Sequence, residues 1–301
     1  MTSGPSSARL LTRGAKIFGK VVSISAANVH RLGWAPGDDE VELIRDIPYT
    51  RRGGKQSVDL YLPKNRDRAR PLPFAFYMHG GGWVIGDRKM GTLMGRHLAS
   101  RGIAVVAPGY RLVPSASLDE QLEDIKQALQ FILDSAGRYG LESERYALIG
   151  ESAGAHLAMR LLQRFPGGPR PRAAVGFYGP YDLEIYRRAK SPWMKAFFRT
   201  IAQGTDLDVV VKSHGALCEL PWTNMPVLLV HGSADRFVPV QNSIRMKELL
   251  ERQGVPVTLT IYPGSGHGFN YQTRVNPQHT LDSYRELVRF FHQHVRTGSS
   301  T

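Results

Sequence analysis

The sequence has little cysteine and no long apolar run. Cys218 is the single cysteine among 301 residues, which excludes an intrachain disulfide and fits a reducing compartment. A lone cysteine in such a chain is usually a small buried hydrophobe, and we expect that role for Cys218. No stretch approaches the roughly 18 uninterrupted apolar residues that a membrane span needs. We therefore predict a cytoplasmic protein, with peripheral contact to a membrane left open.

Acidic residues are scarce relative to basic ones. The chain carries 39 lysines and arginines against 26 aspartates and glutamates, a formal net charge of +13. A basic surface favours acidic partners such as anionic lipid or nucleic acid. The sequence lacks a zinc-finger spacing, a recognition-helix signature and an aromatic–basic RNA motif, so we predict no nucleic-acid binding. The hydrophobic fraction of 42% is that of an ordinary globular protein.

Short apolar runs alternate with helical patterns along the chain. From residue 74 onward most of these runs are continuously apolar, as in strands buried on both faces, whereas the first two alternate, as edge or antiparallel strands do. The alternation of strands and helices predicts right-handed βαβ units and a mostly parallel sheet, an α/β fold. The predicted strands are 41–48, 57–62, 74–78, 103–107, 145–149, 173–178, 227–231 and 257–262, and the clearest predicted helices are 118–134, 241–252 and 278–295.

Two segments interrupt this alternation. Residues 1–40 form a predicted N-terminal amphipathic cap segment, and residues 41–298 form the main domain, with a cap insertion at about 181–222. Within 8–33, apolar residues recur on one helical face and basic residues on another. This pattern fits a cap helix over an apolar pocket, a helix lying on a membrane surface, or a signal peptide.

A serine between two glycines follows the predicted strand 145–149. Residues 150–154 (GESAG) have the pattern G-x-S-x-G where a strand is about to become a helix. In such a turn the serine takes a strained conformation that exposes its Oγ, and the glycines avoid collisions with the neighbouring strand and helix. Ser152 is therefore the predicted catalytic nucleophile. The alternative is a packing turn with an idle serine.

A run of three glycines follows the predicted strand 74–78. Residues 79–83 (HGGGW) expose successive backbone N–H groups, as a site that binds a developing oxyanion requires. The spacing of a phosphate-binding loop is absent here. We expect His79, Gly80 and Trp83 to support this loop. The alternative is a plain glycine-rich turn.

A candidate acid and a candidate base come later in the chain. Asp235 follows the apolar strand 227–231, and His267 lies in a glycine-rich loop after the strand 257–262. An imidazole has the pKa needed to act as a base near neutral pH. Asp182 is the reserve candidate for the acid. The chain order Ser, Asp, His differs from both protease orders. A surface carboxylate and a solvent-exposed histidine are the alternatives.

Taken together, these motifs resemble the HGGG-type carboxylesterases of the α/β-hydrolase superfamily, the group related to hormone-sensitive lipase. The resemblance covers about 41–295, and its tryptophan and AHLA positions look closest to small esterases and kynurenine-formamidase-like enzymes. One departure is Ser115, where the family's YRLAPE motif has a glutamate. The matching motifs, in chain order, are HGGGW, Gly86-Asp87, YRLVP (110–114), LED (122–124), GESAGAHLA (150–158), HGSAD (231–235) and GHGF (266–269).

The resemblance implies an α/β-hydrolase fold, with an eight-stranded, mostly parallel sheet flanked by helices and a helical cap. It also implies that Gly81, Gly82 and Ala153 donate the oxyanion hydrogen bonds. The expected activity is that of a serine carboxylesterase for short- to medium-chain acyl esters, which forms an acyl-enzyme and needs no metal ion or organic cofactor.

Two alternatives to this activity stay open. One is an amide hydrolase such as an arylformamidase, and the other is a non-catalytic small-molecule-binding protein of the same fold. The expected partner is a small-molecule acyl ester. A homodimer and membrane contact through 8–33 are also left open.

Overall fold

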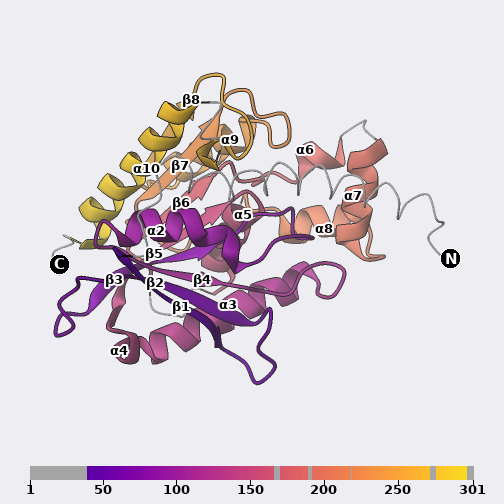
Figure 1. The fold of residues 1–301 in the computed structure, drawn as a ribbon. Coiled ribbons are helices and arrows are strands. Elements are labelled where there is room, and N and C mark those ends of the chain that lie inside the picture. Colours follow the sequence, from indigo (N-terminus) through magenta and orange to yellow (C-terminus); the bar gives the residue numbers. More distant parts are fainter. Residues whose placement is uncertain (1–38, 166–169, 189–191, 218, 272–275, 297–301) are drawn as a thin grey trace.

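An eight-stranded sheet organises the chain (Figure 1). The computed structural model describes residues 39–165, 170–188, 192–217, 219–271 and 276–296. The strands are β1 (Val41–Pro48), β2 (Ser57–Pro63), β3 (Leu72–Met78), β4 (Ala104–Pro108), β5 (Leu141–Glu151), β6 (Ala173–Phe177), β7 (Val227–Gly232) and β8 (Val257–Tyr262). Their order is β1-β2-β4-β3-β5-β6-β7-β8; β1–β2 and β2–β4 pair antiparallel, and the other neighbours pair parallel. The predicted mostly parallel sheet is confirmed.

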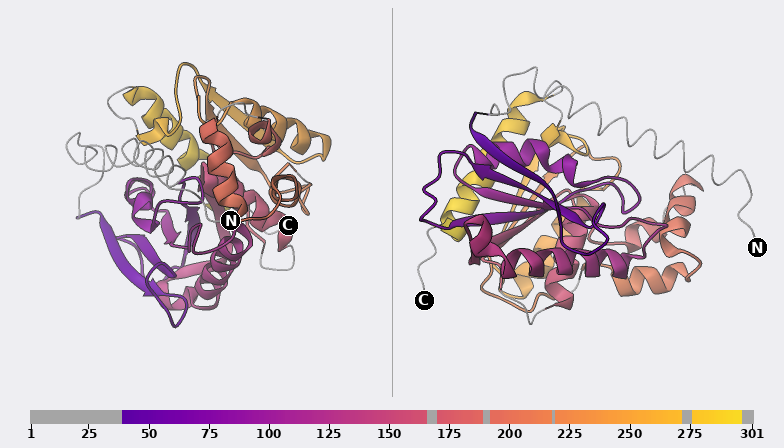
Figure 2. Two further views of the ribbon diagram at one scale, coloured as in Figure 1. Left: turned by 90° about the vertical axis from the view of Figure 1, so that its right-hand side faces the viewer. Right: turned by 60° about the horizontal axis from the view of Figure 1, so that its bottom comes forward.

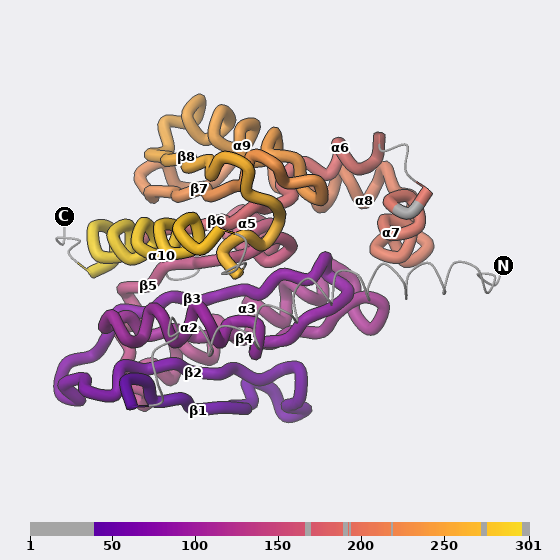
Figure 3. The backbone as a smooth tube through the Cα atoms, turned by 45° about the horizontal axis from the view of Figure 1, so that its top comes forward, coloured from indigo at the N-terminus to yellow at the C-terminus, as the bar shows by residue number. Residues whose placement is uncertain are grey.

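Helices cover both faces of the sheet, as the tube in Figure 3 also shows. Those of the described residues are η2 (Arg88–Gly91), α2 (Thr92–Ala99), α3 (Leu118–Asp134), α4 (Ala136–Tyr139), α5 (Ala153–Arg164), α6 (Glu184–Arg187), α7 (Pro192–Ala202), α8 (Leu207–His214), α9 (Gln241–Arg252), η3 (Phe269–Tyr271), α10 (Pro277–Phe291) and η4 (His292–Arg296). One face carries α3, α5 and α9, whose Ile125, Leu157 and Met246 share a core cluster. The opposite face carries α2 and α10, whose Met94 and Leu287 belong to a second cluster.

All eight predicted strands are present, and their burial explains their sequences. The central strands β3 and β4 are buried almost throughout, so nearly every position is apolar, whereas the edge strand β8 is half-exposed. β5 begins four residues earlier than the predicted 145–149. Leu141 pairs with Leu72 of β3, but the residues from 142 to 145 are only partly buried or exposed and carry no apolar signal.

Two of the three clearest helical predictions hold in full. α3 and α9 have the predicted bounds, 118–134 and 241–252. α3 starts with a capping box, in which the Ser117 side chain accepts from the N–H of Glu120 while the Glu120 carboxylate accepts from the N–H of Ser117. The third predicted helix is divided, because α10 ends at Phe291 and the chain continues into the π-helical turn η4.

The insertion predicted at about 181–222 follows the carboxyl end of β6 and contains α6, α7 and α8. These helices gather beyond one end of the sheet in Figure 1 and in the right view of Figure 2. Tyr186 and Phe198 stack with ring centroids 5.2 Å apart, which joins α6 to α7. The boundaries of the insertion and of the domain stay a prediction.

Several predictions fall on parts of the chain that the structure does not describe. The segment 8–33 and Cys218 lie outside the described residues, so membrane contact and the burial of the cysteine stay predictions. Among the helices that are described, none combines the length and the apolar character that crossing a membrane demands.

Asp124 holds α3 against the loop that follows β4. Its buried carboxylate accepts hydrogen bonds from the Arg111 side chain at 2.9 and 2.7 Å, from the Arg111 backbone N–H at 3.0 Å and from Gln56 at 2.8 Å. The Asp124 side chain, which is 1% exposed, accepts all of these hydrogen bonds. The ion pair therefore links three segments that are distant in sequence.

Replacing Asp124 with Asn removes this charge and is expected to lower the free energy of unfolding by about 2 kcal/mol, less than for a fully buried pair because Arg111 is partly hydrated. Urea unfolding measures the change. The matched control is Glu123→Gln on the exposed side of the same helix, where a change below about 0.5 kcal/mol is expected. Equal stability of the two variants would contradict the assigned role of Asp124.

Candidate active site

Ser152 occupies a strained turn between β5 and α5. Its backbone has φ 53° and ψ −120°, in the region that a residue with a side chain rarely adopts. A Cβ at Gly150 would overlap the Gly154 carbonyl oxygen, and a Cβ at Gly154 would overlap the Met78 carbonyl oxygen on β3. Both glycines are therefore needed for the helix to start this close to the sheet. The turn has the geometry of a nucleophile elbow.

Three side chains from separate segments form one hydrogen-bonded chain. His267 Nδ1 lies 2.7 Å from Asp235 Oδ2, and His267 Nε2 lies 3.0 Å from Ser152 Oγ. An ionised carboxylate only accepts, so Nδ1 carries the proton and Nε2 accepts from the serine hydroxyl. The structure thus places the predicted nucleophile, base and acid in hydrogen-bonding order.

Asp235 is held as a carboxylate by its surroundings. Its Oδ1 accepts from the backbone N–H groups of Phe237 and Val238 at 2.9 and 2.8 Å, and its side chain is fully buried. Burial by itself raises the pKa of Asp235, but hydrogen bonds from His231 and His267 outweigh it and hold the pKa well below its usual value. Asp235 is therefore ionised at neutral pH.

His231 is a member of this site to which the sequence assigned no role, although it ends the predicted strand beside the site. Its Nε2 lies 2.9 Å from the Val238 carbonyl and 3.4 Å from Asp235 Oδ2, while its Nδ1 lies 2.7 Å from the Ser243 hydroxyl. Two acceptors face Nε2, so Nε2 carries the proton and Nδ1 accepts from Ser243. The spacing H-x-x-x-D at the end of a strand was the available signal.

Asp182, the reserve candidate, has a different set of partners. Its Oδ1 accepts from the backbone N–H of Glu184 at 3.0 Å, at the start of α6, and its Oδ2 pairs with Arg245. His267 makes its carboxylate contact with Asp235. The tertiary structure therefore gives the two aspartates different roles.

The glycine loop lies directly against the elbow. A Cβ on Gly80 would lie 3.0 Å from the Glu151 carbonyl oxygen and 3.2 Å from Ser152 Cβ. Gly81 has φ 122° and no room for a side chain, because a Cβ there would overlap the Ile85 carbonyl oxygen. Ala153 is the first residue of α5, where backbone N–H groups have no partner within the helix. The loop and the helix terminus thus meet at the serine.

Buried aromatic contacts support this loop. His79 Nδ1–H donates to the Gly80 carbonyl at 2.7 Å, and its ring stacks on Tyr110 at 4.2 Å. Burial lowers the pKa of His79 to about 4, so it is neutral under ordinary conditions. The Trp83 ring meets the His156 ring edge-on at 5.2 Å. The Trp83 backbone carbonyl accepts a hydrogen bond from the Gln121 side chain at 2.9 Å.

The insertion helix α7 reaches the same loop. A Cβ on Gly82 would lie 2.9 Å from Phe197 Cζ, so the Phe197 ring covers the glycine loop. The neighbouring Phe198 points into the core, where it packs against Trp83 and Tyr186. Phe197 therefore lies beside the glycine loop, whereas Phe198 belongs to the core.

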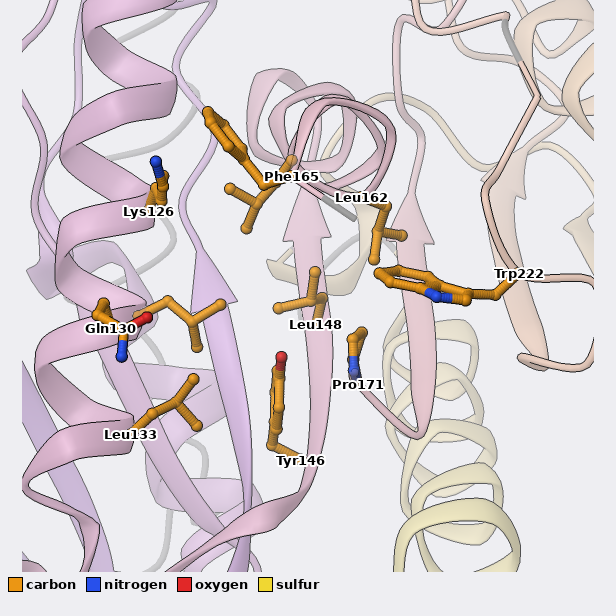
Figure 4. Close-up of a pocket in the computed structure, with 11 residues that line it drawn as sticks. Lys126, Gln130, Leu133, Tyr146, Leu148, Leu162, Phe165, Pro171 and Trp222 are labelled. Atoms are coloured by element: carbon orange, nitrogen blue, oxygen red, sulfur yellow. The ribbon is translucent and has the colours of Figure 1, made fainter. Parts of the chain in front are cut away.

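A separate apolar groove lies between α3, α5 and β5 (Figure 4). Lys126, Leu133, Tyr146, Phe165 and Trp222 are among the residues that line it. None of the predicted site residues contributes to its wall. Within the described ranges, no group of three or more His, Cys, Asp or Glu side chains is arranged to hold a metal ion.

The family of the chain follows from a direct comparison. The family profile described as the α/β hydrolase fold matches residues 75–271, which is most of the chain, so the protein belongs to this family. The fold and the resemblance predicted from the sequence are confirmed.

Individual relatives are esterases by name. The chain is 29% identical to a probable isoprenylcysteine alpha-carbonyl methylesterase of Oryza sativa, over 71% of this chain and 55% of that protein. It is 26% identical to the ethyl acetate hydrolase of Pseudomonas putida, over 77% of each chain. The chain spans about half the length of the plant methylesterases that it matches.

Solved structures agree on the fold. Esterase B of Lactobacillus rhamnosis, inhibited by a tributyrin phosphonate, superposes with a TM-score of 0.80 at 22% identity, over 98% of this chain and 97% of that one. A bacterial heroin esterase superposes with a TM-score of 0.72 at 20% identity, over 97% and 93% of the two chains.

Neutral buried histidines make the stability of this region depend on pH. Burial lowers the pKa of His156 to about 3, below the unfolded value of about 6.5. Above pH 6.5 both states are neutral; as pH falls, the unfolded chain takes up the proton first, so the native state loses stability.

His156→Gln is expected to flatten this dependence. The wild type should lose about 3 kcal/mol more unfolding free energy than the variant between pH 6.5 and 4. Glutamine retains an N–H group that can reach the His214 carbonyl, the present partner of His156. Urea unfolding at several pH values gives both slopes. Identical slopes for the two proteins would contradict the burial of a neutral His156.

Proposed function

We propose that this protein is a serine carboxylic ester hydrolase. The observation that carries the proposal is the continuous hydrogen-bonded chain from Ser152 through His267 to Asp235, which starts at the strained turn. This arrangement matches the roles of nucleophile, general base and orienting acid in serine hydrolysis. The relatives named as ester hydrolases support it.

Acylation begins when Ser152 Oγ attacks the carbonyl carbon of the ester. His267 Nε2 takes the hydroxyl proton, and Asp235 holds the tautomer and stabilises the imidazolium that results. The charge develops on the former carbonyl oxygen. Backbone N–H groups of Gly81, Gly82 and Ala153 are the proposed donors to it, since the loop and the start of α5 meet beside the serine.

Collapse of the tetrahedral intermediate returns the proton from His267 to the alcohol, which leaves. Water then attacks the acyl carbon while His267 removes its proton. The bond between that carbon and Ser152 Oγ breaks, His267 returns the proton to Oγ, and the free acid is released. The protein supplies every proton acceptor and donor in these steps, so the mechanism uses no metal ion or organic cofactor.

Short- to medium-chain acyl esters are the proposed substrates. The Phe197 ring covers the glycine loop and narrows the space beside the oxyanion donors. Two of the similar proteins bear names that refer to small esters or to a short-chain inhibitor, ethyl acetate hydrolase and the tributyrin phosphonate complex. Amide hydrolysis is the competing activity, because the same three side chains serve both reactions.

Hydrolysis of p-nitrophenyl esters from acetate to palmitate tests this function. The wild type should prefer the shorter chains, and Ser152→Ala should lower kcat by roughly 10⁴–10⁶, as in other triads. Retained turnover in a clean Ser152→Ala preparation would refute the nucleophile assignment. Preference for palmitate would refute the proposed chain length, and turnover of N-formyl amides alone would favour the amidase.

Two aspartate variants test the proposed acid. Asp235→Asn should lower kcat by about 10³–10⁴ because an amide no longer favours the required tautomer of His267. Asp182→Asn should leave kcat close to the wild-type value, because Asp182 is bonded to Glu184 and Arg245. The same ester assay reads both variants. A larger loss in Asp182→Asn than in Asp235→Asn would reverse the assignment.

A further inference from the structure

A second buried carboxylate lies immediately before the nucleophile. Glu151 Oε1 accepts from Asn270 Nδ2 at 2.6 Å, while Oε2 accepts from the Tyr77 hydroxyl at 2.5 Å and from the Tyr271 hydroxyl. We call these four residues the Glu151 cluster. Glu151 is 2% exposed, and the steps described above do not use it.

The Glu151 cluster reaches the catalytic histidine through one further side chain. The Tyr178 hydroxyl donates to Asn270 Oδ1 at 2.5 Å, and the Tyr178 ring meets the His267 ring edge-on at 4.7 Å. Asn270 and Tyr271 also follow His267 closely in the chain, on the short helix η3. Glu151 therefore joins the nucleophile turn to the segment that carries the base.

The number of protons in the cluster allows two states. The Tyr77 and Tyr271 oxygens also lie 2.8 Å apart, so three close oxygen pairs share two hydroxyl protons when Glu151 is ionised. A protonated Glu151 supplies a third proton, one for each pair. The cluster can therefore hold the carboxyl group in its charged and in its neutral form.

Most of the groups that face Glu151 are neutral. Tyr77 comes from β3, Tyr178 follows β6, Tyr271 lies on η3 and Tyr284 lies on α10; all four interact electrostatically with Glu151. His267, which takes up a proton during acylation, also interacts electrostatically with Glu151. Burial raises the pKa of Glu151 to about 7, although hydrogen bonds from Tyr271, Tyr77 and Asn270 favour the charged form.

We propose that Glu151 is a positioning residue for His267. The negative charge of Glu151, held by the tyrosine and asparagine donors, stabilises the imidazolium that His267 forms during acylation. The inference rests on the proposed function. Tyr178 transmits the position, because its hydroxyl is tied to Asn270 and its ring packs on the imidazole. The charge acts only when the histidine carries a proton, so it favours the transition state over the resting enzyme.

Glu151→Gln tests the proposal because the amide has the shape of the protonated acid and no charge. At pH 8.5, kcat should fall about tenfold while KM changes little. The ratio of wild-type to variant kcat should shrink toward one as pH falls to 6, because the wild-type carboxyl group is then also neutral. A defect in folding alone would lower the rate equally at every pH.

The matched control is Glu142→Gln, the same substitution at the other end of β5, where Glu142 pairs with Arg145 on the surface. Its kcat should equal that of the wild type at each pH. Three results would overturn the proposal: an unchanged kcat in Glu151→Gln, a deficit that is constant with pH, or a change in KM alone.

A fluorophosphonate probe separates this inference from the proposed function. The Ser152 oxygen displaces fluoride from phosphorus and its proton passes to His267, so labelling needs no ester substrate. Labelling of the wild type, its loss in Ser152→Ala and a slower rate in Glu151→Gln at pH 8.5 would support both. Equal rates in the wild type and Glu151→Gln would overturn the inference alone, and an unlabelled, inactive wild type would overturn both.

Discussion

The close approach of α5 to the sheet is the constraint on which the site depends. At Gly154 the helix lies so close to the Met78 carbonyl of β3 that a side chain would not fit. At Gly150 a side chain would likewise collide with the first turn of the helix. Helix α5 can therefore start directly after β5, with Ser152 at positive φ between them. The same contact brings Gly80 against the Glu151 carbonyl, so the glycine loop and the nucleophile turn form one packed unit.

The buried carboxylates of Asp235 and Glu151 both act on His267, but their own surroundings differ. Asp235 accepts from backbone N–H groups and from two histidines, which holds its pKa low despite burial. Glu151 accepts mainly from neutral hydroxyl and amide groups, and burial raises its pKa to about 7. Backbone dipoles and adjacent imidazoles therefore keep Asp235 ionised. The neutral hydroxyl and amide donors around Glu151 leave its pKa close to neutral pH.

The parts of the molecule that local pattern determines could be predicted. Strands β3 and β4 are continuously apolar because both of their faces are covered, and α3 has a capping box and apolar residues at helical spacing. Prediction was poorer where burial is partial. The first residues of β5 are half-exposed, and their place in the sheet comes from pairing between Leu72 and Leu141, which no local pattern reveals.

The sequence by itself determined the strand-to-helix turn at Ser152, the glycine loop and the chain order of serine, aspartate and histidine, because each depends on a few adjacent residues. Only the tertiary structure decided that Asp235 meets His267 while Asp182 pairs with Arg245. It also decided that Glu151, Tyr77 and Tyr271 share one buried cluster. The physical reason is that side chains up to 194 residues apart meet only when the parallel strands align their carboxyl ends at one edge of the sheet.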